Sequence, residues 1–202
     1  MSAARPSLSD GFTDLAPGKV ANVVTCLEMR ERPAKRFEPE VGNLQLVRRN
    51  APNLSWYRDI FRRVGAPYLW FSRLQLDDAA LTAILNDQNV ELYVVQADDR
   101  ELGLMELDFF PGQCELRFFG LTEGAIGKGI GRWLLNRAIE RAWSRPIEVF
   151  RVRTCTLDHP GALDFYVRAG FRAYKREIEV CDDPRLTDLL PVDAAPHVPI
   201  VR

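Results

Sequence analysis

The chain has 202 residues, 47% of them hydrophobic, which is enough to bury one sizeable core and a small appendage. Lys and Arg total 27 against 28 Asp and Glu, and the net charge of -1 gives no whole-protein reason to expect a nucleic-acid or anionic-membrane partner. No run approaches the roughly 20 apolar residues of a membrane span, and residues 1–12 lack the apolar core of a signal peptide. We therefore expect a cytoplasmic protein with small-molecule or protein partners, no nucleic-acid partner and no membrane partner.

Cysteine and histidine usage also argues against a disulfide framework or a metal centre. Cys26, Cys114, Cys155 and Cys181 lie far apart, without a CxxC pair or a cluster of histidines. His159 precedes a proline and is interpreted as part of a helix start, because one histidine without a partner is seldom a metal ligand. We expect no metal and a reducing compartment.

The first elements are two strands and an amphipathic helix. Residues 1–20 are rich in Ser, Ala, Pro and Gly and predict a flexible N-terminal extension. Residues 23–29 and 44–49 predict strands, and residues 53–64 predict a helix with Asn53 as its N-cap.

The next elements are a helix and three strands. Asp77 and Asp78 mark a helix start, and residues 91–98 predict a strand. Residues 100–110 and 113–121 predict two strands of a hairpin, because Pro and Gly lie between them.

The strand at 113–121 shows a break in its alternation. Apolar and charged residues alternate from Cys114 to Phe118, which predicts that Glu115 and Arg117 share the face opposite Phe118. Phe119 then follows Phe118 directly, so two apolar residues are adjacent. This pair predicts a β-bulge or a change of face.

Three alternating glycines then open a helix. Gly127, Gly129 and Gly131 precede RWLLNRAIERAW (132–143), whose apolar residues have helical spacing. Unpaired N–H groups and the positive end of the dipole make a helix N-terminus a site for anions, and glycine lets a phosphate approach closely. The pattern is typical of a phosphate-binding loop.

Other meanings of this loop fit less well. A P-loop needs a lysine followed by Ser or Thr, which is absent. A dinucleotide site needs GxGxxG in a parallel βαβ unit, whereas the spacing is GxGxG and the preceding strands look antiparallel. A simple glycine-rich connection remains open on this loop alone.

A second segment, CTLDHPGALDFYVRAGFRAY (155–174), narrows the choice. Taken with IGKGIG (126–131), it resembles two motifs of the GNAT superfamily of N-acetyltransferases, in the right order and about 35 residues apart. The first motif is [Q/R]xxGx[G/A], and Ile126 departs from it. The second has an Asn where Asp158 stands here. The resemblance covers roughly residues 67–180.

The resemblance implies an α/β (α+β) fold: a mixed, mainly antiparallel central sheet flanked by helices, with a V-shaped splay between two parallel strands, 113–121 and 147–157. Acetyl-CoA would enter that gap as cosubstrate. The implied contacts are Phe119, Gly120, Leu121 and Asp158 to the pantetheine arm, Gly127, Lys128, Gly129, Ile130, Gly131 and Arg132 to the pyrophosphate, and Tyr166 near the sulfur. A single acyltransferase domain would span 21–181, followed by an extended tail, 182–202.

The implied activity is transfer of an acetyl group to a primary amine of a small or amino-acid-like acceptor by direct attack in a ternary complex. A carboxylate would accept the proton of the ammonium group; Glu115 is our first choice, with Glu106 and Asp108 as alternatives. Tyr166 would protonate the departing sulfur. The alternative function is a non-catalytic acyl-CoA-binding or interaction module, and a homodimer stays open.

The acceptor region is expected in the aromatic stretch before the middle strands and in the C-terminal loops. Five residues of that stretch are candidates to line a pocket: Trp56, Tyr57, Tyr68, Trp70 and Phe71.

Overall fold

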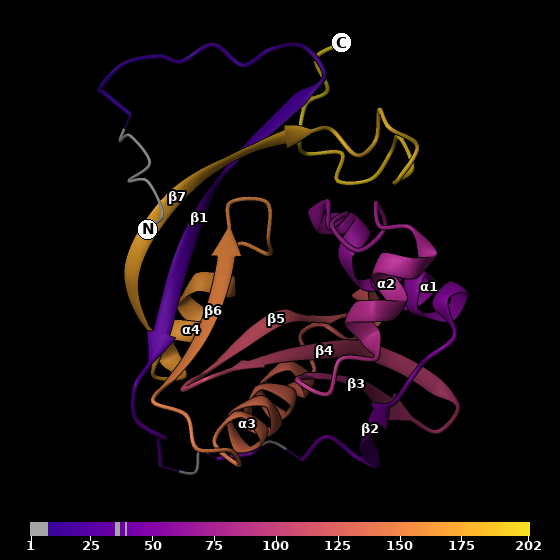
Figure 1. Ribbon diagram of the computed structural model, residues 1–202, viewed down its shortest axis with the longest axis vertical. Helices are drawn as coiled ribbons and strands as arrows, with labels where there is room; N and C mark the ends of the chain where they lie inside the picture. The colour runs from indigo at the N-terminus through magenta and orange to yellow at the C-terminus, as the bar shows by residue number, and fades with distance from the viewer. Residues whose placement is uncertain (1–7, 35–36, 39) are drawn as a thin grey trace.

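A computed structural model of the chain describes residues 8–34, 37–38 and 40–202. It contains a seven-stranded sheet with the order β2-β3-β4-β5-β6-β1-β7 (Figure 1). The strands are β1 (Lys19–Met29), β2 (Leu44–Arg49), β3 (Val90–Ala97), β4 (Arg100–Phe110), β5 (Gln113–Leu121), β6 (Val149–Cys155) and β7 (Arg172–Asp182). The helices are α1 (Leu54–Gly65), α2 (Asp78–Leu85), α3 (Ile130–Ala142) and α4 (Ala162–Arg168), with short 3-10 turns η1 (Ala66–Tyr68) and η2 (Glu123–Ala125).

The sheet separates two hydrophobic cores. One is formed with α3 and α4 and includes Leu134, Phe150 and Phe171, and the other is formed with α1 and α2 and includes Phe61 and Leu81. All neighbouring strands are antiparallel except β5 and β6, which are parallel. The predicted mixed, mainly antiparallel α/β fold is confirmed. None of the described helices is long and apolar enough to cross a membrane.

Local signals placed the first two helices correctly. The Asn53 side chain accepts hydrogen bonds from the backbone N–H groups of Ser55 and Trp56, at 2.9 and 3.3 Å, as an N-cap does. The Asp77 side chain accepts from the N–H of Ala80 at 2.7 Å and starts α2. Both helix starts and the β4–β5 hairpin are therefore confirmed.

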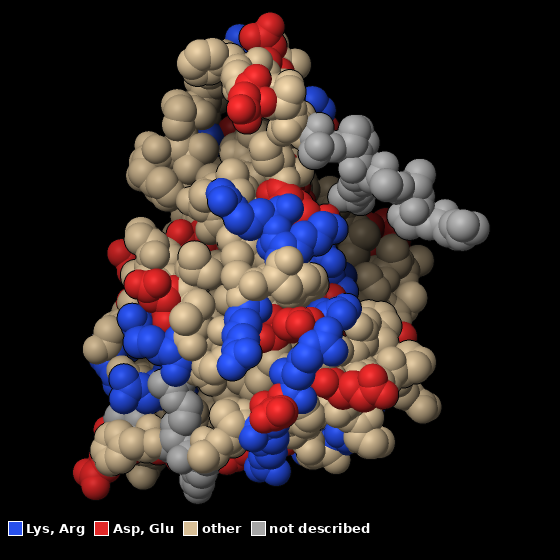
Figure 2. All heavy atoms as spheres, turned by 90° about the vertical axis from the view of Figure 1, so that its left-hand side faces the viewer, with Lys and Arg blue, Asp and Glu red and all other residues tan. Residues whose placement is uncertain are grey.

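Strand β1 occupies a place that the sequence did not indicate. It lies between β6 and β7, with Val24 opposite Cys155 on one side and Glu177 on the other. The first long strand of the chain thus completes the sheet beside the last one. Figure 2 looks on to the side where β1 and β7 lie and shows positive and negative side chains interleaved there.

The segment after β7 corrects our expectation of an extended tail. Arg185 is buried and donates to Asp183 at 2.7 Å and to the backbone carbonyls of Ala194, Ala195 and Val198 at 3.2, 3.3 and 2.8 Å. Leu190 and Ala195 join the core formed with α1 and α2, over which this coil lies in Figure 1. We call residues 183–198 the C-terminal clasp. Prolines stop regular structure in the clasp, yet its buried ion pair and apolar contacts hold it folded.

Residues 1–7 lie outside the described residues, and β1 begins at Lys19, inside the expected extension. The domain limits that we assigned stay a prediction.

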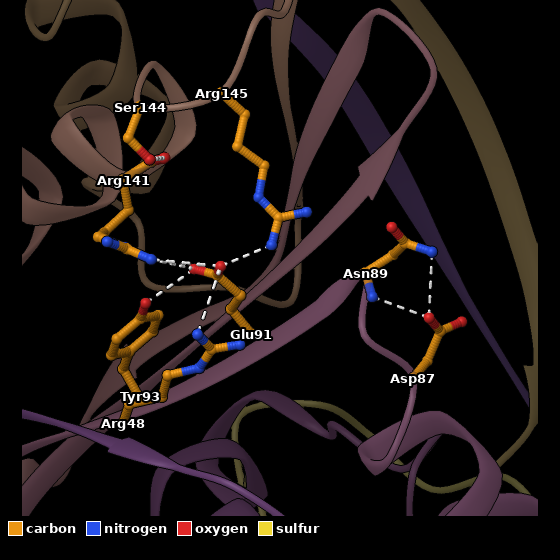
Figure 3. A network of polar contacts seen from close by, with 8 residues as sticks. All are labelled: Arg48, Asp87, Asn89, Glu91, Tyr93, Arg141, Ser144 and Arg145. Atoms are coloured by element: carbon orange, nitrogen blue, oxygen red, sulfur yellow. Dashed lines mark hydrogen bonds and ion pairs between the residues drawn. The ribbon is translucent and has the colours of Figure 1, made fainter.

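A buried carboxylate ties β3 to α3. The Glu91 carboxylate accepts from the Tyr93 hydroxyl at 2.7 Å, from Arg145 at 2.7 Å and from Arg141 at 3.0 Å, and Arg48 lies 3.8 Å away (Figure 3). Burial works to raise the pKa of Glu91, but the hydrogen bonds from Tyr93, Arg145 and Arg141 lower it overall. Glu91 is therefore held ionised beneath the last turn of α3.

Candidate active site

Strands β5 and β6 pair over only four residues and then diverge. Gln113 to Leu116 face Val149 to Val152, and the two strands form no further pairs beyond that point. The predicted splay is therefore present. A cleft of about 520 Å³ opens where the strands separate. Its walls come from Trp70, residues 116–119 of β5, residues 152–155 and Asp158, Ala162 and Tyr166, and Val24 with residues 177–180 of β1 and β7.

A β-bulge lies at the start of the splay. Glu106 faces Phe118 and Leu107 faces Leu116, so Arg117 is the extra residue of β5. Phe118 therefore packs in the core of α1 and α2, whereas Phe119 packs in the core of α3 and α4. The predicted bulge is confirmed, but Phe118 lies on the face opposite to that expected from simple alternation.

The glycine loop is arranged as a helix start with left-handed backbone. Gly127 and Gly129 both have φ of 81°, a conformation that glycine adopts without the penalty of a side chain. Trp133 is the first residue of α3 whose N–H bonds back to the loop, to the carbonyl of Gly129 at 3.2 Å. The preceding N–H groups have no helical acceptor, and this arrangement favours an anion. Lys128 turns back and donates to the carbonyl of Gly124 at 2.6 Å.

Tyr166 lies deep in the cleft. It is 6% exposed, and its ring is 6.1 Å from that of Phe119 and 5.9 Å from that of Phe171. Burial raises the pKa of the Tyr166 hydroxyl, and the charge of Asp158 raises it further. The sequence-predicted residues Phe119, Asp158 and Tyr166 thus meet in one cleft.

Asp158 is more fully engaged than the sequence suggested. One carboxylate oxygen accepts from the Trp70 indole N–H at 3.2 Å, and the other accepts from the Thr154 hydroxyl at 2.9 Å and the Cys155 N–H at 2.8 Å. The carboxylate therefore fixes the end of β6 and ties it to Trp70.

The packing of Trp70 in the cleft wall is the feature of this site that the sequence indicated least well. Two glycines make room for it: a Cβ on Gly65 would lie 2.5 Å from the Trp70 Cβ, and one on Gly120 would lie 3.1 Å from its ring and 2.4 Å from Val64. The indole packs 5.4 Å from the Phe118 ring. Among the five aromatic residues expected at the acceptor site, Trp70 lines the cleft, whereas Tyr57 is buried in the core and Trp56 donates to Glu101.

The three carboxylates considered as bases all contact arginines. Glu115 lies 3.1 Å from Arg117 and 3.5 Å from Arg153, and both arginines line the cleft. Asp108 accepts from Arg117 at 2.9 Å. Glu115 is thus the carboxylate with two partners in the cleft.

Glu106 is the most buried of the three. It accepts from the Tyr57 hydroxyl at 2.8 Å and from Arg73, and burial raises its pKa. Glu106 and Asp108 lie two residues apart on β4, and Glu115 and Arg117 lie two residues apart on β5. Residues at this spacing in a strand point to the same face, so the sequence indicated that the members of each pair share a face.

No group of three or more His, Cys, Asp or Glu side chains in the described part of the chain is placed to hold a metal ion. All four cysteines are free thiols, and burial raises the pKa of Cys155 to about 11, which keeps it from acting as a thiolate.

A splayed parallel strand pair, a bulge and a glycine-rich helix start together define the fold of an acetyltransferase. Residues 53–171, more than half of the chain, match the model of the acetyltransferase (GNAT) family, and the chain belongs to this family. No curated protein sequence matches the chain.

Solved structures share the fold at low identity. A conserved protein of unknown function from Staphylococcus epidermidis ATCC 12228 has a TM-score of 0.53 and 16% identity; the match covers 82% of this chain but 63% of that one. An aminoglycoside acetyltransferase from an uncultured soil metagenomic sample, in complex with trehalose, has a TM-score of 0.52 and 18% identity over 62% and 86% of the two chains. A GNAT family acetyltransferase from Elizabethkingia anophelis with acetyl-CoA bound has a TM-score of 0.51 and 19% identity over 66% and 78%.

Proposed function

We propose that the chain is an N-acetyltransferase that moves the acetyl group of acetyl-CoA to a primary amine of a small or amino-acid-like acceptor. The observation that carries this proposal is the cleft where β5 and β6 separate, because it joins the bulge of β5 with Tyr166. Family membership and the acetyl-CoA bound to the Elizabethkingia anophelis protein support the donor.

The donor would lie along β5 and the start of α3. Phe119, Gly120 and Leu121 follow the last β5–β6 pair, so the backbone edge of β5 beyond that pair has no strand partner toward β6 and is offered to the amides of a pantetheine arm. The N–H groups from Gly127 to Arg132 would receive the pyrophosphate. Asp158 would act indirectly, by fixing Trp70 and the end of β6.

The proposed reaction needs one proton removed and one supplied. The amine nitrogen attacks the thioester carbonyl carbon, the C–S bond breaks, and coenzyme A leaves as a thiolate that Tyr166 protonates. Glu115 would receive the ammonium proton through water, because it lies beside Arg117 and Arg153 of the cleft wall and is not itself a lining residue. A backbone N–H at the bulge would stabilise the oxyanion.

The charges of the cleft favour a cationic acceptor. Three carboxylates, Asp158, Glu177 and Glu179, line it with two guanidinium groups, Arg117 and Arg153. The balance is negative, which attracts an ammonium group and disfavours a polyanion such as nucleic acid. With four free thiols, we place the protein in the cytoplasm.

One observation favours a non-catalytic acyl-CoA-binding module instead. Each carboxylate considered as a base already forms an ion pair with an arginine, so none of the three is left open to an acceptor amine alone. The two functions share the donor site and differ in turnover.

Calorimetric titration with acetyl-CoA and coenzyme A, with NADH and ATP as controls, tests the donor site first. Gly127→Ala should weaken coenzyme binding about tenfold, because alanine is strained at the left-handed φ of this residue. Gly124→Ala is the matched control, since its Cβ would meet nothing within 4 Å. Absence of coenzyme binding by the wild type would contradict both functions.

A second assay separates the two functions. The release of the coenzyme A thiol from acetyl-CoA is measured in the presence of each of a panel of primary amines. If the protein is an enzyme, it should accelerate this release with at least one amine. Coenzyme binding without turnover on any amine would favour the binding module.

A further inference from the structure

The cleft joins the two faces of the sheet. On β5, Phe119 packs in the core formed with α3 and α4, where Tyr166 also lies, whereas Phe118 packs in the core formed with α1 and α2. Both phenylalanines line the cleft, so the gap between β5 and β6 opens to either face. Trp70 lines the cleft on the second face, because it packs against Phe118 and the core formed with α1 and α2.

The indole of Trp70 contacts both sides of this gap. Its N–H donates to Asp158, just beyond the end of β6, at 3.2 Å. On the other side, a Cβ on Gly120 of β5 would lie only 3.1 Å from the ring, so the ring and the strand are in close contact. Gly120 lies beyond Leu116, the last residue of β5 that pairs with β6. The indole therefore spans the gap where the two strands have already separated.

The backbone before Trp70 holds the indole in this position. Leu69 has φ of 54° and ψ of 36°, a left-handed conformation that a residue with a side chain seldom adopts. Leu69 is buried, and the backbone N–H of Trp70 donates to the carbonyl of Gly65 at 3.0 Å, so packing and a hydrogen bond both fix this turn. Backbone strain of this kind is concentrated at functional sites. Trp70 is thus a fixed part of the cleft wall.

The proposed donor would approach from the opposite face of the sheet. A Cβ on Gly131, at the end of the glycine loop, would lie 3.8 Å from the ring of Phe165, whose centroid is 5.4 Å from that of Tyr166. With the pyrophosphate at this loop and the sulfur beside Tyr166, the acyl group is the part of the coenzyme that extends furthest toward Trp70. This step rests on the donor site of the proposed function and does not require turnover.

We propose that Trp70 sets the upper limit on the size of the acyl group that the cleft admits, so that an acetyl group fits and longer acyl chains do not. The methyl end of an acetyl group would contact the apolar surface of the ring. A longer chain would have to displace an indole that its hydrogen bond to Asp158 and its contact with Phe118 hold in place. Forcing extra methylene groups into a well-packed site is unfavourable.

The wall formed by β6, β1 and β7 gives a longer acyl chain no good alternative. Arg153, Glu177 and Glu179 alternate there with apolar residues such as Val24 and Ile178. A hydrocarbon chain along this wall would remove water from the charged groups without supplying hydrogen bonds in return. This side of the cleft instead suits the amine of an acceptor, which leaves the acyl group on the side of Trp70.

Calorimetric titration with coenzyme A and with its acetyl, butyryl and hexanoyl thioesters tests the proposal. The wild type should bind butyryl-CoA about tenfold more weakly than acetyl-CoA, or more weakly still, because methylene groups that a pocket cannot accommodate cost at least this much. Hexanoyl-CoA should bind more weakly again. Trp70→Ala should remove the indole from the gap and reduce the ratio of the two Kd values to less than about threefold.

Trp70→Leu keeps an apolar side chain against Phe118 and should lower the same ratio by at least about threefold. It provides the test if the alanine variant does not fold, which circular dichroism checks. Trp56→Ala is the matched control. Its indole donates to Glu101 and is not part of the cleft wall, so its loss should leave the preference for acetyl-CoA unchanged.

A wild type that binds butyryl-CoA as tightly as acetyl-CoA overturns the proposal. So does a folded Trp70 variant that keeps the wild-type preference, or a Trp56 variant that loses it. In these cases the coenzyme still binds, so the donor site of the proposed function stands. A wild type that binds none of the four coenzymes contradicts the proposed function and this inference together.

Discussion

At the scale of single residues, Tyr166 combines burial with an ionisable group. Its hydroxyl has no hydrogen-bond partner among the described side chains and faces a cleft that also contains Asp158. Burial raises its pKa above the ordinary value of about 10, so the neutral, proton-bearing form persists through the physiological range and beyond. A proton donor for a leaving thiolate needs this form.

Tyr166→Phe is therefore expected to lower kcat roughly 100-fold while the Kd for coenzyme A changes little. The removed hydroxyl bonds no described group, so the Tm should stay near that of the wild type. The wild-type rate should show no loss from Tyr166 ionisation as the pH rises to about 10. Tyr174→Phe, at an exposed tyrosine, is the control. An unchanged kcat in Tyr166→Phe would remove Tyr166 from the mechanism.

The sequence predicted which residues meet in the cleft better than it predicted their contacts. The motif around Tyr166 was enough to place it, because a local pattern on one helix decides its position. The three donors on Asp158 come from Trp70 and the end of β6, and the former is 88 residues away. Such a contact depends on the packing of distant segments, which no local pattern encodes.

At the scale of elements, the Glu91 cluster joins three of them. The carboxylate comes from β3, Arg141 comes from the last turn of α3, Arg145 comes from the turn that follows α3, and Arg48 comes from β2 (Figure 3). Arginine near the C-terminus of a helix also interacts favourably with the helix dipole. The cluster thus fixes how α3, whose first turn follows the glycine loop, lies against the sheet.

Glu91→Gln should lower the free energy of unfolding by about 2–3 kcal/mol, measured by urea denaturation. The loss of a fully buried partner costs roughly 3–5 kcal/mol, but these arginines are partly exposed and can reach water. Asp87→Asn, in the adjacent turn of Figure 3, should change it by less than about 0.5 kcal/mol. Equal effects of the two substitutions would contradict the structural role of the cluster.

The same scale shows where prediction from the sequence ends. The strand character of residues 23–29 follows from their apolar composition, and the structure confirms it within β1. Its place between β6 and β7 does not follow, because neighbours in the chain usually become neighbours in the sheet and β1 does not pair with β2. Pairing at such separation is decided by the whole fold.

At the scale of the whole molecule, the C-terminal clasp extends the protein beyond the segment that matches the family. That match ends at residue 171, while Arg185 and Asp183 lie in the clasp with side chains 1% and 3% exposed. Their ion pair holds the clasp against the core of α1 and α2, next to the helix that positions Tyr57. We expected a tail here because the prolines of this segment disfavour helices and strands, and the sequence pattern did not indicate the apolar contacts of Leu190.

Arg185→Ala should lower the free energy of unfolding by about 3–5 kcal/mol, since it leaves the buried Asp183 carboxylate and three carbonyl groups unpaired. Arg185 lowers the pKa of Asp183 in the folded state. A lowered folded-state pKa contributes stability above the ordinary Asp value of about 3.9, and this contribution is lost as the pH falls through the lower folded value. The difference in the free energy of unfolding between wild type and variant should therefore have its full size at pH 7 and become smaller below about pH 4.

Urea unfolding of both proteins at neutral and acidic pH measures this gap. Arg168→Ala is the control, because its side chain is 66% exposed and lies 4.0 Å from Asp164, so less than about 0.5 kcal/mol should be lost. A clasp that merely rests on the surface would give Arg185→Ala the small, pH-independent effect of the control. A large effect that fades with acid instead makes the clasp part of the cooperative core, because an ion pair confined to a loose segment cannot change the global unfolding free energy.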